Sequence, residues 1–191
     1  MNPDGASVYV TGFSLGLGGI YEFATISYDA LTGKERWVAR FGGPGDAGGF
    51  GYALGVSPDG AEVFATGEVF VGFNDYGTVA YDARTGAKRW AVLYGGDGGY
   101  SVATALAVNP EGRAVYITGS STDRTTGTGY ATVAYSTGTG RQLWARRYSG
   151  PDSQEDDAYA IATTPDGDVV FVTGRSYGPT DADFATVAYK A

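Results

Sequence analysis

Carboxylates are the side chains of this sequence best suited to chemistry, and one acidic segment gathers four of them. The segment SGPDSQEDDAY, residues 149–159, contains Asp152, Glu155, Asp156 and Asp157. Ca²⁺ takes roughly six to eight oxygen ligands, many of them carboxylates, so these residues are a candidate calcium site. The comparable segments 42–50 and 95–101 each keep a single Asp. The alternative interpretation is therefore an ordinary solvated loop.

Catalysis has few other side chains to use in this chain. A pair of carboxylates at a suitable separation could hydrolyse a glycosidic bond, but nothing in the sequence sets such a separation. The chain has no Cys and no His, which excludes thiol nucleophiles, thiolate metal sites and Ser-His-Asp triads. We therefore predict no catalytic residue and no bound cofactor, with calcium as the one candidate ion.

The charge and hydropathy of the chain exclude two further classes. The formal net charge is −8, whereas binding to nucleic-acid phosphates needs clustered Lys and Arg. No apolar run approaches the length of a membrane span, and no signal segment opens the chain. We expect neither nucleic-acid binding nor a membrane span.

An acid, a threonine, a glycine and a tryptophan recur together in the chain. The segment YDARTGAKRW, residues 81–90, has a near copy at 28–37 and a degenerate copy at 135–144. A catalytic group is needed once, so repetition indicates a structural corner. Asp accepts hydrogen bonds from turn amides, Thr supports the turn, and Gly takes a left-handed conformation. The predicted corner residues are Asp29, Thr32, Gly33, Asp82, Thr85, Gly86 and Gly140.

The corners are one part of a longer repeat that predicts the fold. A turn proline recurs at intervals of 52–55 residues, at Pro3, Pro58, Pro110 and Pro165. One repeat contains four strand-like segments, A to D, for example 101–108, 114–119, 130–135 and 142–148. The third segment is apolar or small on both faces, which is typical of a blade covered by neighbouring blades. A β-sandwich is the rival, but it leaves the four-strand period unexplained.

We therefore predict an all-β fold, a single region over residues 1–191 built of β-propeller repeats. The approximate repeats are 2–56, 57–108, 109–163 and 164–191 (partial). Fourteen strands in the order BCD-ABCD-ABCD-ABC make about four blades. We expect an open arc or a segment of a larger propeller. Unpaired strand edges at its two ends would invite self-association.

The corner also carries a family resemblance. The segment AYDARTGAKRW fits the pattern A-x-D-x-x-T-G-x-x-x-W at every fixed position. It resembles the tryptophan-docking motif of the pyrroloquinoline-quinone-type propellers, which implies that Trp37, Trp90 and Trp144 each dock on the following blade. The repeat is also similar to those of secreted and surface proteins of bacteria, which implies an extracellular or cell-envelope location. Quinone-dependent dehydrogenases carry a vicinal Cys pair, and this chain has none.

The loops between the second and third strands differ most among the repeats. Segments 12–23 and 67–77 are rich in apolar side chains, and variable loops on a rigid scaffold are where binding commonly resides. The candidate binding residues are Phe13, Leu15, Leu17, Ile20, Phe70, Val71 and Phe73. The alternative is that they extend the flanking strands or cover a blade edge.

The predicted function is a non-enzymatic scaffold for protein or glycan binding. The alternative is a segment of a propeller enzyme, a quinoprotein-like oxidoreductase or a hydrolase, whose catalytic residues lie largely outside this chain.

Overall fold

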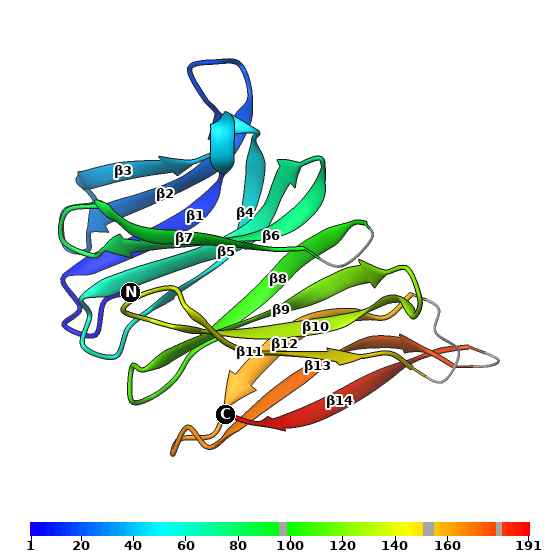
Figure 1. Cartoon of the computed structure of the whole chain (residues 1–191). Coiled ribbons are helices and arrows are strands. Elements are labelled where there is room, and N and C mark those ends of the chain that lie inside the picture. The colour runs from blue at the N-terminus through cyan, green and yellow to red at the C-terminus, as the bar shows by residue number, and fades with distance from the viewer. Residues whose placement is uncertain (96–98, 151–154, 179–180) are drawn as a thin grey trace.

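The computed structural model describes residues 1–95, 99–150, 155–178 and 181–191, and among these it is all β (Figure 1). Fourteen strands form four sheets, accompanied by one 3-10 helix, η1 (Pro44–Asp46). The first sheet contains β1 (Ser7–Leu15), β2 (Tyr21–Asp29) and β3 (Glu35–Phe41). The second contains β4 (Gly49–Val56), β5 (Glu62–Val71), β6 (Phe73–Asp82) and β7 (Lys88–Tyr94). The third contains β8 (Ser101–Val108), β9 (Ala114–Asp123), β10 (Gly127–Ser136) and β11 (Gln142–Tyr148). The fourth contains β12 (Asp157–Thr163), β13 (Val169–Tyr177) and β14 (Ala182–Lys190).

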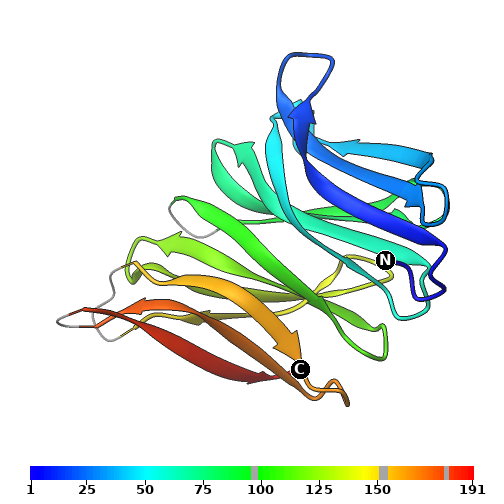
Figure 2. The same cartoon turned by 180° about the vertical axis from the view of Figure 1, so that it is seen from behind.

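The strand order is the predicted one. Every sheet is an antiparallel meander, with three strands in the first and last sheets and four in the two between them. The described sheets do not close into a ring: the first and the last lie at opposite ends of the arc in both views (Figures 1 and 2). The predicted propeller segment of about four blades is confirmed.

In the second, third and fourth sheets, a glycine in the second strand sets how closely the first strand approaches. A Cβ added at Gly67 would lie 1.9 Å from the carbonyl oxygen of Phe50, and one at Gly119 would lie 2.0 Å from that of Val102. The innermost strands β4, β8 and β12 each change register beside this glycine, because one extra residue is inserted there. Such a bulge bends a strand and re-aims its side chains.

The hydrophobic core consists of layers between successive sheets. Between the first two sheets, Phe23 and Trp37 pack against Val63, Val79 and Tyr81. Equivalent layers separate the second sheet from the third and the third from the fourth. Each sheet also carries a pair of facing threonine hydroxyls about 3 Å apart. The pairs are Thr11–Thr25, Thr66–Thr78, Thr118–Thr132 and Thr173–Thr186.

The hairpins between the second and third strands are longer than predicted. Phe13 and Leu15 lie in β1, Phe70 and Val71 in β5, and Phe73 in β6. Leu17 and Ile20 lie between β1 and β2. Of the two interpretations of segments 12–23 and 67–77, extension of the flanking strands therefore holds for these five residues, because the antiparallel ladder continues almost to the turn, with Val71 paired to Phe73.

Candidate binding surface at the loop end of the first three sheets

The repeated corners are closed by hydrogen bonds that their aspartates accept. One oxygen of Asp82 accepts from the backbone N–H and the hydroxyl of Thr85, both at 2.9 Å, and the other pairs with Arg89 at 2.9 Å. These bonds to Arg89 and Thr85 lower the pKa of Asp82 to about 2. Asp29 makes the same contacts with Thr32 and Arg36. Both carboxylates are therefore engaged in holding the corner.

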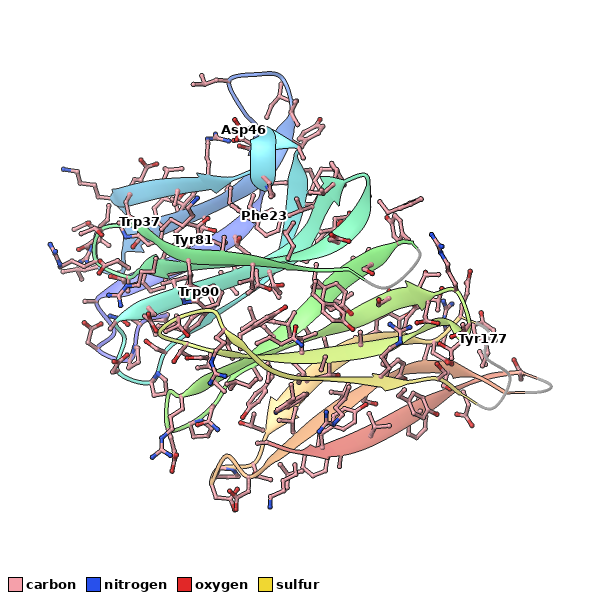
Figure 3. All side chains as sticks on the ribbon, viewed as in Figure 1. Phe23, Trp37, Asp46, Tyr81, Trp90 and Tyr177 are labelled. Carbon is pink, nitrogen blue, oxygen red and sulfur yellow. The ribbon has the colours of Figure 1, made fainter. Side chains whose placement is uncertain are left out.

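Each tryptophan lies against the sheet that follows it. The indole N–H of Trp37 donates to the carbonyl oxygen of Ala83 at 3.0 Å, and that of Trp90 donates to Thr137. A Cβ added at Gly86 would lie 2.7 Å from the Trp37 ring, and one at Gly140 would lie 2.8 Å from the Trp90 ring. Figure 3 shows Trp37 and Tyr81 together between the first two sheets, with ring centroids 6.2 Å apart. The rings of Trp144 and Tyr189 are 6.1 Å apart between the last two sheets.

The acidic segment is engaged in structural contacts where it is described. Asp152 lies outside the described residues. The Asp156 carboxylate is buried and accepts the N–H groups of Gly150 and Tyr177 at 2.6 and 2.9 Å. Asp157 pairs with Arg175, while Glu155 is exposed. Among the described residues, no group of three or more acidic, His or Cys side chains could hold a metal ion. The calcium hypothesis stays a prediction.

The structure brings two of the predicted apolar residues, Phe13 and Phe70, together around Phe50, a residue that the sequence analysis did not single out. The Phe50 ring of β4 lies 4.5 Å from the Phe13 ring and 5.1 Å from the Phe70 ring, centroid to centroid. Tyr21 and Tyr52 extend the cluster on either side of Phe50. Phe13 is 53% exposed, so the cluster reaches the surface. Leu15, Leu17, Ile20, Val71 and Phe73 are exposed around it.

A buried carboxylate beside this cluster holds two exposed tyrosines. Glu68 is only 4% exposed, and its Oε1 accepts the Tyr52 hydroxyl at 2.5 Å. Its Oε2 accepts the Asn74 amide, and the Tyr100 hydroxyl at 3.2 Å. Burial and the neighbouring Glu68 raise the pKa of both phenols, so they remain protonated donors. The carboxylate therefore fixes two rings that are 44% and 57% exposed, one in β4 and the other directly before β8.

These aromatic residues form one surface, in which the Tyr52 and Tyr100 hydroxyls are engaged by Glu68. We call it the aromatic surface; it consists of Phe13, Tyr21, Phe50, Tyr52, Phe70 and Tyr100. Fixed, exposed aromatic side chains are enriched at the centres of binding interfaces because they bury a large area at a low entropy cost. The arrangement is suited to binding.

Comparison with known proteins gives the family. Residues 4–178 match the family model described as outer membrane protein assembly factor BamB. The chain belongs to this family. No curated protein matches this BamB-family chain.

Solved structures with the same fold extend well beyond the BamB family. Hydrazine synthase from Kuenenia stuttgartiensis superposes with a TM-score of 0.67 at 14% identity, over 90% of this chain and 47% of that one. The WD40 domain of Toxoplasma gondii coronin gives 0.57 at 12% identity, over 91% and 43%. TolB from Acinetobacter baumannii gives 0.53 at 18% identity, over 98% and 39%.

At these identities the similarity shows the propeller fold alone, and the chain spans less than half the length of each of these proteins. None of its described residues belongs to a helix long and apolar enough to cross a membrane.

Proposed function

We propose that this chain is a non-enzymatic propeller scaffold that binds a protein partner through the aromatic surface. The observation that carries the proposal is the buried Glu68, which fixes Tyr52 and Tyr100 while leaving their rings exposed. Rings that are already ordered lose little conformational freedom on binding. Membership of a family described as an assembly factor supports a protein partner.

The same family supports a location in the cell envelope, because its description refers to the assembly of outer membrane proteins. The similarity of the repeat to those of secreted and surface proteins of bacteria is in keeping with this proposal.

Two alternative functions, glycan binding and catalysis, would need other groups. A glycan would stack on single exposed rings and would need polar groups nearby, and Tyr52 and Tyr100 already donate their hydroxyls to Glu68. A propeller enzyme would need catalytic groups. The described carboxylates of the corners and of Asp156 and Asp157 are engaged in hydrogen bonds or ion pairs, which makes them poor candidates; on this alternative the catalytic residues lie largely outside this chain.

The test is selection of peptides that bind the immobilised chain from a random displayed library. We expect enriched peptides to lose at least tenfold in affinity for Phe13→Ala and Tyr100→Ala variants. Leu31→Ala is the matched control, since Leu31 is a large apolar residue, 94% exposed, in the corner at the opposite end of the first sheet. Enriched peptides that bind both surface variants as tightly as the original chain would overturn the proposal.

A further inference from the structure

The two end sheets each present one uncovered face. In the last sheet, the face turned away from the third sheet carries Phe184, which is 77% exposed, and Phe171. In the first sheet, the face turned away from the second carries Val10, which is 48% exposed, and Val38. We call the uncovered face of the last sheet the leading face and that of the first sheet the trailing face. Residues of the leading face are Phe171, Thr173, Phe184, Thr186 and Ala188, and those of the trailing face are Val8, Val10, Ala24, Ile26 and Val38.

Both faces repeat surfaces that are buried between the inner sheets. Counting from the strand glycine and the strand register, Phe184 occupies the position of Phe23, Tyr76 and Tyr130. Those three side chains are at most 1% exposed, and each packs toward the next sheet. The Tyr76 hydroxyl donates to the carbonyl oxygen of Ala131 in the third sheet at 3.2 Å. The leading face is thus a fourth copy of a contact surface.

The trailing face has the same relationship to its counterparts. Val8 occupies the position of Val63, Val115 and Val170, all of which are fully buried against the preceding sheet. Val10 and Ile26 lie opposite each other in the register, as Ala65 and Val79 do in the second sheet. In each of the three layers between successive sheets, the surface equivalent to the leading face packs on the surface equivalent to the trailing face.

We propose that the leading face of one copy of this chain packs on the trailing face of a second copy, head to tail. The occupant is a second copy because this chain itself supplies the surface that covers a leading face in each internal layer. Each face also carries a shallow hollow. The hollow beside Phe184 has a volume of about 350 Å³, and the one beside Val10 about 340 Å³.

Contact between faces differs from pairing between strand edges. The outer edges of β1 and β14 have no neighbouring strand in their described sheets, yet packing of the faces buries Val10 and Phe184 without a new strand ladder. The contact is heterologous, since different surfaces of the two copies meet, and such a contact builds a ring or an open chain of copies. Phe13 of the aromatic surface also lines the hollow beside Val10, so the two surfaces adjoin. A contact with a second copy of this chain nevertheless goes beyond the proposed function.

The test measures the mass of the 191-residue chain by sedimentation velocity over a concentration series. We expect the original chain to reach the mass of two or more copies. Val10→Glu and Phe184→Glu, each with a charge on one open face, should both sediment as single copies. An equimolar mixture of the two variants should form a two-copy species, because each contributes one intact face. Phe73→Glu is the control at an exposed aromatic residue on neither face, and it should associate like the original chain.

Other outcomes overturn the proposal. If the original chain remains a single copy at every concentration, the faces do not bind each other. If either charged variant associates alone, the contact is between like surfaces or elsewhere. If the mixture remains monomeric while both variants keep the far-UV circular dichroism of the original chain, the two faces are not complementary.

Discussion

The indole of Trp37 reaches the carbonyl oxygen of Ala83, 46 residues later in the chain and one sheet further along the arc. The hydroxyl of Tyr9 donates to the same oxygen at 3.2 Å. Trp90 repeats the relationship with Thr137. Each contact joins the outermost strand of one blade to the corner of the next, so the corner and its neighbour stabilise each other.

The shared acceptor predicts coupling between Trp37 and Tyr9. Trp37→Phe and Tyr9→Phe each leave the Ala83 carbonyl with one donor, and we expect each hydrogen bond lost to cost about 1 kcal/mol. The double variant removes both donors from a buried carbonyl, so it should lose more than the sum of the single variants. Urea unfolding of the four proteins measures this. Strict additivity would show that the shared oxygen does not couple the two side chains.

A pair of corner glycines separates backbone strain from docking. Gly33 and Gly86 have φ values of 67° and 72° in nearly identical corners. A Cβ at Gly33 meets nothing within 4 Å, whereas at Gly86 it would meet the Trp37 ring. Gly33→Ala should therefore cost about 1–2 kcal/mol from the left-handed backbone alone. Gly86→Ala should cost clearly more. Equal unfolding midpoints in denaturant would show that Trp37 does not restrict the corner.

The corner carboxylates predict a loss of stability in acid. Arg89 and Thr85 lower the pKa of Asp82 to about 2 in the folded chain, against about 3.9 in an unfolded one. The contribution of Asp82 is thus present above the unfolded value and is lost as the pH falls through the folded one. Because the group is exposed, the effect should be small. We expect Asp82→Asn to lower the urea midpoint at pH 5 and to have less effect at pH 2; a constant difference would contradict this.

Glu68 should stabilise the second sheet through its three donors. Glu68→Gln places an amide against the Asn74 amide and removes the charge, so we expect a loss of about 1–3 kcal/mol in unfolding free energy. The pKa of Tyr52, which burial and Glu68 raise, should fall, as followed by tyrosinate absorbance during alkaline titration. Tyr52→Phe should also destabilise the chain. Tyr159→Phe, at the equivalent bulge of the last sheet, is the matched control; a similar loss there would show that Glu68 adds nothing.

The repeated features could be predicted because they are local and occur several times. The strand order and the number of sheets follow from the recurring corner and turn proline. The hairpin lengths were mispredicted because the turn glycine, Gly72 with a φ of 70°, is one of several glycines in segment 67–77, and the sequence does not show which of them ends the ladder. The Glu68 network was missed for a different reason. Its donors Tyr52 and Tyr100 lie 16 and 32 residues away from Glu68 in the sequence. The residues that correspond to Glu68 in the other sheets are Phe13, Ser120 and Arg175, and none of them is a carboxylate.

The direction of the tryptophan contacts has a consequence for how the chain is made. Trp37 precedes Ala83, and Trp90 precedes Thr137, by nearly one repeat. On a ribosome the docking side chain therefore emerges before the corner that receives it. Each new blade can pack on one that is already present, while the tryptophan of that earlier blade docks only once the next corner has been synthesised. Growth of the arc can proceed in step with translation, with the leading face of the newest blade and the trailing face of the first blade left exposed.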